Sequence, residues 1–223
     1  MINVSGVSKI YESPAGPVSV LNNLDLTVAS GEAVSIVGPS GSGKTTLLNI
    51  LGALDSPTTG TIEIGGQNIA ELDEAATANF RNRSIGFIFQ LHYLLPQCSV
   101  LENILIPRLA GGWEESAADT KARAEVLLED VGLKERMTHK PYQLSGGEQL
   151  RVAIARSLIN EPKIILADEP TGSLDPATGE KVADLLIESN LGKGVALVVV
   201  THNPGLAAKM EKTYQLADGK LVS

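Results

Sequence analysis

A short glycine-rich string at residues 38–45, with the sequence Gly-Pro-Ser-Gly-Ser-Gly-Lys-Thr, constrains the fold of this chain more than any other feature. It fits the pattern G-x-x-x-x-G-K-[ST], in which glycines let the backbone turn and point its N–H groups at nucleotide phosphates. The apolar run 33–37 before it predicts a buried strand. The segment 46–51 after it predicts a helix whose N-terminus attracts an anion. A chance glycine-rich turn is the alternative interpretation, and the flanking strand and helix make it the weaker one.

The pattern assigns chemistry to individual side chains of this string. Lys44 is expected to reach the β- and γ-phosphates of a nucleotide, and the hydroxyl of Thr45 is expected to bind Mg²⁺. The helix N-terminus adds its own N–H groups to the same site. The predicted phosphate-binding residues are Gly38, Pro39, Ser40, Gly41, Ser42, Gly43, Lys44, Thr45 and Thr46.

A second anion-binding pattern follows about a hundred residues later. Ser145 is a favourable N-cap, and Gly146 and Gly147 leave N–H groups bare at the start of a helix predicted over 149–160. Since the first loop already surrounds its phosphates, this second site is expected to serve a nucleotide held by another copy of the chain. The apolar strand predicted next, over 163–169, ends in two acidic residues. Acids at the end of such a strand are costly unless they meet a metal ion or a partner.

In this order, the motifs resemble the ATP-binding subunits of ATP-binding-cassette (ABC) transporters, and the resemblance covers essentially the whole chain. It implies an α/β fold, namely a P-loop NTPase cassette with a RecA-like parallel-sheet core, an antiparallel β subdomain and a helical signature subdomain. Residues 1–88 and 158–223 are expected to form the core with the antiparallel subdomain, and residues 91–157 the helical subdomain. ATP and Mg²⁺ are the implied cofactors, and ATP hydrolysis coupled to transport is the implied activity.

The resemblance also implies a role for each matching residue. Tyr11 stacks on adenine, and Gln90 touches Mg²⁺ and the attacking water. Asp168 holds Mg²⁺ through water, Glu169 is the general base, and His202 contacts the γ-phosphate. Taken singly, a tyrosine, glutamine or histidine at such positions is explained by packing or by surface exposure, and only their order along the chain favours the functional interpretation. The implied signature that closes on the γ-phosphate of the opposite subunit comprises Ser145, Gly146, Gly147 and Glu148, with 173–175 crossing the dimer interface.

Two segments indicate which transporter branch the chain is similar to. Residues 87–107 and 167–175 look like the ATPases of the lipoprotein-releasing (Lol) system and its relatives, the macrolide exporters and a cell-division ATPase. The string Leu-His-Tyr-Leu-Leu-Pro at 91–96 favours the lipoprotein branch. The implied partners are a second copy of the chain and transmembrane permease subunits that dock near Gln90 to Pro107. The implied location is the cytoplasmic face of the inner membrane.

Composition agrees with this interpretation. The 223 residues suit one domain, and the net charge of −8 argues against nucleic acid as a partner. A single cysteine, Cys98, allows no internal disulfide, and no N-terminal signal is visible. The longest apolar run, 195–200, is too short to span a bilayer, so transport is expected to need separate membrane subunits.

The sequence leaves two alternatives to a transporter ATPase, and it departs from the family pattern at two positions. An ABC-type ATPase without a transporter would need a coiled-coil insertion or a second cassette, and a catalytically dead binder would not keep Lys44 and Glu169. Leu150 stands where the family usually has glutamine, and Asn203 where it has aspartate. Neither removes a catalytic group, so activity is expected.

The remaining pattern predicts elements around these motifs. Strands that pair antiparallel are predicted at 3–11, 18–28 and 61–64, with turns at 14–17 and 65–66. A capping-box pattern at Ser116 predicts a helix to about Val131 that stops near Gly132. Further elements are predicted as strands at 85–89 and 195–201 and a helix from 176 to about 188.

Overall fold

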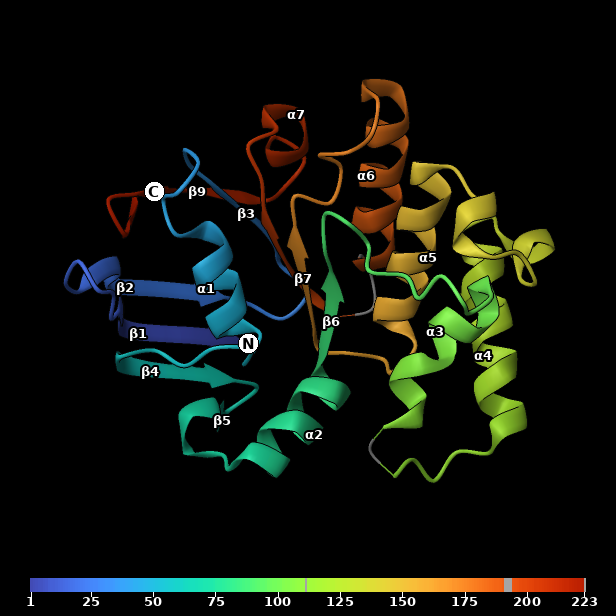
Figure 1. The fold of residues 1–223 in the computed structure, drawn as a ribbon, viewed down its shortest axis with the longest axis horizontal. Coiled ribbons are helices and arrows are strands. Elements are labelled where there is room, and N and C mark those ends of the chain that lie inside the picture. The colour runs from blue at the N-terminus through green and yellow to red at the C-terminus, as the bar shows by residue number, and fades with distance from the viewer. Residues whose placement is uncertain (111, 191–193, 223) are drawn as a thin grey trace.

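The computed structural model describes residues 1–110, 112–190 and 194–222, and these residues form two β-sheets and a set of helices (Figure 1). The described part of the smaller sheet is antiparallel and four-stranded, with the order β2-β1-β4-β5. Its strands alternate buried and exposed side chains, because only one face covers the core. They are β1 (Ile2–Tyr11), β2 (Val18–Val28), β4 (Thr59–Ile64) and β5 (Gln67–Asn68).

The larger sheet has six strands among the described residues, in the order β10-β9-β3-β8-β7-β6. The strands from β9 to β6 are parallel, and β10 pairs antiparallel with β9. The central strands β3, β7 and β8 are nearly continuous apolar runs because both of their faces are covered, whereas β9 is largely polar. Their bounds are β3 (Ala33–Val37), β6 (Ile85–Ile88), β7 (Ile164–Asp168), β8 (Ala196–Val200), β9 (Lys212–Ala217) and β10 (Lys220–Val222).

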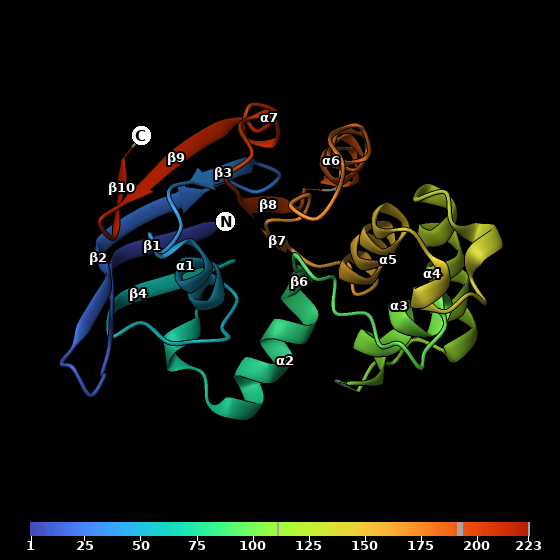
Figure 2. The same ribbon diagram turned by 45° about the horizontal axis from the view of Figure 1, so that its top comes forward.

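Helices cover the two faces of this parallel sheet. Helix α1 lies between the two sheets, and α3, α4 and α5 gather on the other side, away from the antiparallel sheet (Figure 2). The helices are α1 (Lys44–Leu51), α2 (Glu74–Ser84), α3 (Val100–Leu109), α4 (Ala117–Asp130), α5 (Gly146–Leu158), α6 (Pro176–Asn190) and α7 (Pro204–Ala207). Short 3₁₀ turns occupy Ile69–Glu71, Lys134–Arg136 and Pro141–Gln143.

Two hydrophobic clusters form the core, one on each face of the parallel sheet. Successive strand residues point to opposite clusters, so that Val198 packs with α1 and the antiparallel sheet while Val199 packs with α5 and α6. Residues Leu47 and Leu51 of α1 are fully buried in the first cluster. The sheet is therefore clamped on both faces, which holds the loops at the carboxyl ends of its strands in place.

The α/β cassette fold and the predicted strands and long helices are confirmed. One helix, α2, lies between the turn at 65–66 and the strand at 85–89, where no helix was predicted. Helix α5 begins at Gly146 rather than at 149, because Ser145 and Glu148 form a capping box there. The division at residues 88–91 and 157–158 stays a prediction. Within the described residues, no helix is long and apolar enough to cross a membrane.

Candidate active site

The glycine-rich loop joins the end of β3 to the start of α1, as predicted. Gly41 and Gly43 have φ values of 79° and 100°, a left-handed backbone that favours glycine. Position 38 has room only for glycine, since a Cβ there would lie 2.3 Å from the carbonyl oxygen of Leu216 on β9. The Nζ of Lys44 donates to the carbonyls of Gly38, at 2.9 Å, and of Pro39, at 3.0 Å. The ammonium group of Lys44 therefore lies within the glycine-rich loop.

An acidic group from β7 meets this loop. The hydroxyl of Thr45, in the first turn of α1, donates to Oδ2 of Asp168 across 3.2 Å, although β8 separates β7 from β3, the strand that leads into the loop. Burial raises the pKa of Asp168, and the neighbouring charge of Glu169 raises it further, while the hydrogen bond from Thr45 and the charge of Lys44 oppose the shift. A carboxylate that is disfavoured in its charged form gains most from a bound cation.

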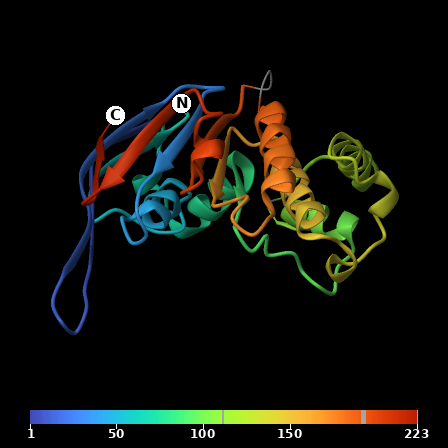
Figure 3. The ribbon, with the colours of Figure 1, turned by 90° about the horizontal axis from the view of Figure 1, so that it is seen from above.

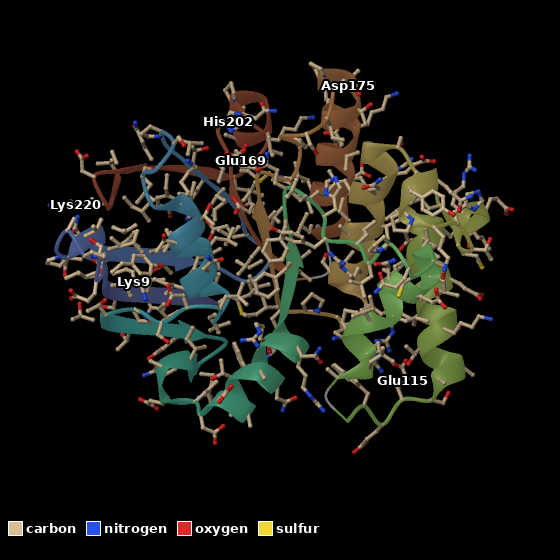
Figure 4. The ribbon with its side chains drawn as sticks, viewed as in Figure 1. Lys9, Glu115, Glu169, Asp175, His202 and Lys220 are labelled. Atoms are coloured by element: carbon tan, nitrogen blue, oxygen red, sulfur yellow. The ribbon has the colours of Figure 1, made fainter. Side chains whose placement is uncertain are left out.

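The side chain of Glu169 is held by the segment that follows β8. Its Oε2 accepts hydrogen bonds from Oγ1 of Thr201, at 3.0 Å, and from the backbone N–H of His202, at 3.2 Å. Its Oε1 lies 2.8 Å from Nδ1 of His202, which must donate because a carboxylate only accepts. Figure 4 shows Glu169 and His202 beside each other. Sequence reasoning missed Thr201, although a threonine directly before His202 at the end of a buried strand was a usable signal.

One cavity collects most of the predicted catalytic and phosphate-binding residues, and Val20, which was not predicted, joins them. The predicted metal and catalytic residues Gln90, Asp168, Glu169 and His202 all line it. Tyr11 does not line it and lies at the end of β1, 39% exposed. The lining residues are Val20, Ser40, Gly41, Gly43, Lys44, Thr45, Thr46, Gln90, Asp168, Glu169 and His202.

The signature residues lie apart from this cavity, at the N-terminus of α5. Ser145 Oγ accepts from the Glu148 N–H, and a Glu148 carboxylate oxygen accepts from the Ser145 N–H at 2.8 Å. This hydrogen bond is the main reason that the pKa of Glu148 is lowered. Ser145, Gly147 and Glu148 line a second hollow, between α5 and α6. The chain thus does not bring its signature to its own phosphate loop.

The two signature glycines pack closely against the segment that follows Glu169, and at Gly147 there is no room for a side chain. A Cβ on Gly147 would lie 2.5 Å from Cγ2 of Thr178 in α6, closer than two carbons can approach. A Cβ on Gly146 would lie 3.2 Å from Cδ2 of Leu174. The position of α5 relative to α6 therefore depends on the absence of a side chain at Gly147.

Asn203 and Leu150, which depart from the family pattern, both fit their surroundings in the structure. The side chain of Asn203 caps α7 by accepting from the N–H groups of Gly205, at 2.9 Å, and Leu206, at 3.3 Å. Aspartate would cap in the same way. Leu150 is 1% exposed and packs in the cluster that joins α3, α4 and α5 to the sheet.

The loop after Gln90 borders a groove between α2, β6, α3 and α5. His92 and Tyr93 have φ values of 60° and 46°, and Arg156 of α5 fixes this turn by donating to both of their carbonyls, at 2.5 and 2.8 Å. The groove contains the side chains Leu54, Arg81, Phe87, Phe89, Tyr93, Ile106, Pro107, Arg156 and Asn160 among others. Leu91 and Tyr93 are 70% and 60% exposed, whereas Val100 and Ile104 are fully buried core residues.

Comparison with known proteins agrees with this fold, which is that of an ATP-binding cassette. The family model described as ABC transporter matches residues 21–172. This chain belongs to the ABC transporter family. Within the family it resembles ATP-binding subunits named "Lipoprotein-releasing system ATP-binding protein LolD". It is 50% identical to the one from Syntrophus aciditrophicus, over 100% of this chain and 99% of that protein, and 47% identical to the one from Bacteroides fragilis, over 100% of both chains.

Solved structures give the same result. The structure described as a dimeric post-hydrolysis state of the ATP-binding cassette MJ0796 bound to ADP and Pi superposes with a TM-score of 0.91. It is 42% identical and covers 100% of this chain and 97% of that one. A further dimeric structure of MJ0796, a bacterial ABC transporter cassette, has a TM-score of 0.90 at 44% identity, with the same coverage. Members of this family bind and hydrolyse ATP, and this chain is an ATP-binding subunit of that family.

Proposed function

We propose that the chain hydrolyses Mg–ATP in the cavity at the carboxyl ends of β3, β7 and β8, and that this drives a membrane transporter that releases lipoproteins. The observation that carries the proposal is the convergence of Lys44, Asp168, Glu169 and His202, from three different strand ends, on one cavity. Strand ends of a clamped parallel sheet place such groups rigidly, which phosphoryl transfer needs because its catalysis is mainly positioning and charge stabilisation.

The residues present fit a magnesium ion. Mg²⁺ is bound by one or two protein oxygens, with phosphates and water completing its six ligands. The hydroxyl of Thr45 and the carboxylate of Asp168 are 3.2 Å apart, and Gln90 lines the same cavity. Among the described residues, no group of three or more His, Cys, Asp or Glu side chains is placed to hold a metal ion by itself, which is compatible with a site that uses only one or two protein ligands. When bound, Mg²⁺ would neutralise charge on the phosphate oxygens.

Each side chain then has a defined task. Lys44 leaves the carbonyls of Gly38 and Pro39 for the β- and γ-phosphates, so its charge moves from neutral acceptors to anionic ones. Glu169 accepts a proton from the attacking water. His202 holds the Glu169 carboxylate through Nδ1 and would turn to contact the γ-phosphate. The 71% exposure of its side chain leaves it free to turn toward a ligand.

We propose that the signature of a second copy completes each site. The signature N-terminus is exposed at α5, away from its own phosphate loop, and the neighbours of known structure are cassette dimers. A head-to-tail pair related by a two-fold axis would place each signature on the other copy's nucleotide and make two identical sites.

This pairing is tested by mixing two inactive variants. Lys44→Ala removes the phosphate ligand, and Ser145→Arg places bulk where the partner's γ-phosphate must lie. In a mixed dimer, one site carries both lesions and the other carries none. An equal mixture is therefore expected to recover about a quarter of the wild-type sites, since half of the dimers are mixed. A mixture as inactive as its components would show that sites are not shared.

We propose that the membrane partner docks in the groove beside Gln90. Among the described residues the groove is lined by apolar and aromatic side chains and by Arg81 and Arg156, without an acidic residue, on a chain whose net charge is −8. Both guanidinium groups donate to uncharged backbone carbonyls. These groups fit a short apolar segment that carries a carboxylate.

Docking is tested with a matched pair of exposed apolar positions. Leu91→Glu places a charge beside the groove, while Val126→Glu places it at a 57% exposed position on α4 outside it. We expect Leu91→Glu to abolish stimulation of ATPase activity by the co-purified permease, with ATP binding intact, and Val126→Glu to behave as wild type. Crosslinks from the permease that consistently avoid residues 90–107 would contradict the site.

Lipoprotein release is tested separately. The assembly would be reconstituted in vesicles that contain an acylated lipoprotein, and ATP-dependent appearance of the lipoprotein in solution would be measured, with macrolide export as the competing outcome. Such a partner would place this chain at the cytoplasmic face of the inner membrane. The lipoprotein branch is supported by the names of the relatives, at 46–50% identity.

A further inference from the structure

Tyr11 belongs to a compact polar cluster outside the cavity. Its hydroxyl donates to Oδ2 of Asp55 across 2.6 Å. The Nζ of Lys9 donates to Oδ1 of Asp55 at 2.6 Å and to the carbonyl of Ser56 at 2.7 Å, and it lies 4.7 Å from the centre of the Tyr11 ring. One cation thus holds the carboxylate that anchors the ring and also covers a face of the same ring. Lys9 lies on the antiparallel sheet, as Figure 4 shows.

The cluster joins two parts of the molecule that carry different pieces of the site. Lys9 and Tyr11 are on β1, just before the β1–β2 turn that projects from the body of the molecule in Figure 3. Asp55 follows α1, and its N–H donates to the carbonyl of Asn49 in that helix at 3.3 Å. Since α1 starts in the phosphate loop, Asp55 fixes Tyr11 relative to that loop.

A second contact supports this placement. The hydrogen bond to Asp55 is the main cause of a raised pKa of Tyr11, burial adds to it, and a hydrogen bond with Thr46 opposes it. Thr46 is in the first turn of α1 and lines the nucleotide cavity. The hydroxyl of Tyr11 is therefore within reach of the cavity's own wall, although its ring lies outside the cavity.

The cluster is built tightly enough to orient a ring. The side chain of Lys9 is 12% exposed and that of Asp55 is 28% exposed, so the pair is shielded from solvent more than an ordinary surface pair. Both carboxylate oxygens of Asp55 accept hydrogen bonds. Oδ2 accepts from Tyr11, and Oδ1 accepts from Lys9 and from the N–H of Ser56 at 2.7 Å. Tyr11 itself is 39% exposed, which leaves ring surface for a ligand.

We propose that Lys9 and Asp55 are positioning residues that hold the Tyr11 ring as a platform for a purine base, at a fixed distance from the phosphate loop. The ligand class is a purine nucleoside triphosphate, as opposed to any polyphosphate. Lys9 covers one face of the Tyr11 ring, so the base would stack on the opposite face. This inference rests on the proposed nucleotide site. A ring that is already ordered before binding raises the affinity for the base, because binding then loses less side-chain entropy.

The test compares a ligand that has a base with one that has none. Dissociation constants for ATP and for inorganic tripolyphosphate, both with Mg²⁺, would be measured by calorimetry on the full chain. The variants are Lys9→Met, which keeps the aliphatic stem, and Asp55→Asn, which keeps the shape, with Tyr11→Ala to remove the platform. Lys134→Met is the matched control, because Lys134 forms an exposed pair with Glu129, at 2.9 Å, far along the chain from this cluster.

We expect Lys9→Met and Asp55→Asn to weaken ATP about 3–10-fold and to leave tripolyphosphate unchanged, as loss of a charge-assisted hydrogen bond that orients a ligand group would do. In the Tyr11→Ala background the same substitutions are expected to have no further effect. Equal weakening of both ligands, or a persistent effect without Tyr11, would overturn the proposal. If the wild-type chain bound neither ligand, the nucleotide site itself would be wrong instead.

Discussion

The close approach of Gly147 to Thr178 leads to a sharp prediction for the signature helix. Replacing Gly147 by alanine puts a Cβ 2.5 Å from Cγ2 of Thr178, whereas ordinary carbon contacts begin near 3.4 Å. The start of α5 must then move away from α6 by about 1 Å. Overpacking of this kind costs about 1–3 kcal/mol, and the better helix propensity of alanine returns up to about 1 kcal/mol. A net loss near 1 kcal/mol lowers Tm by only about 2–4 °C in a chain of this size.

The effect on turnover is expected to be much larger than the effect on stability. A displacement of about 1 Å at groups that position a reacting phosphate costs about 10²-fold in rate. ATP binding by the isolated chain is expected to stay normal, because the phosphate loop is untouched. The assays are steady-state phosphate release, calorimetric ATP binding and thermal unfolding on the same preparation.

Two variants make this reasoning refutable. Thr178→Ser deletes Cγ2 but keeps the hydroxyl, so the double variant Gly147→Ala/Thr178→Ser is expected to regain most of the lost rate. Gly146→Ala meets only the end of the Leu174 side chain, at 3.2 Å, and is expected to lose less than about tenfold. Wild-type turnover in Gly147→Ala, or a double variant no faster than the single one, would refute the steric explanation.

Three further predictions concern the cavity. Glu169→Gln is expected to slow hydrolysis about 10²–10⁴-fold in single-turnover phosphate release and to accumulate ATP-bound dimers in sedimentation, so turnover near the wild-type rate would exclude Glu169 as the base. Lys44→Ala is expected to weaken ATP at least about tenfold by calorimetry, because a charge-assisted phosphate contact is lost, and unchanged affinity would contradict its role. Burial raises the pKa of Asp168, so its ionisation opposes folding once the pH exceeds the unfolded pKa of about 4. Asp168→Asn is therefore expected to raise the Tm of the nucleotide-free chain at pH 7 by roughly 1–4 °C, with the difference shrinking toward pH 3, and an unchanged or lower Tm at pH 7 would be the contrary result.

The sequence could predict the elements whose signals are local. The run 33–37, the glycine string after it and the acids that end β7 each identify their own structure within a few residues. Ser145 predicts the helix start as an N-cap, although the helix itself was predicted to begin only at residue 149. Such patterns suffice because a phosphate loop or a cap is built from neighbours in sequence.

Other features depend on residues that are distant in sequence. Helix α2 carries Phe80 as its only large apolar side chain, so it has no apolar stripe to reveal it, and its N-cap at Asp73 is the sole local signal. The cluster around Tyr11 needs Asp55, 44 residues away, and the restriction on Gly147 comes from Thr178. Local sequence patterns cannot reveal these contacts, because they form only when the two sheets and α6 pack together.

The strand order has a consequence for how the protein is made. The phosphate loop precedes β8 (196–200) and β9 (212–217) by about 150 residues, but its strand β3 lies between these two strands in the sheet. During synthesis β3 therefore has no neighbours in the sheet until these later strands have left the ribosome. Such non-local pairing folds late and slowly. A nascent chain would therefore lack the assembled cavity, with Lys44, Glu169 and His202 brought together, until β3 has paired with β8 and β9.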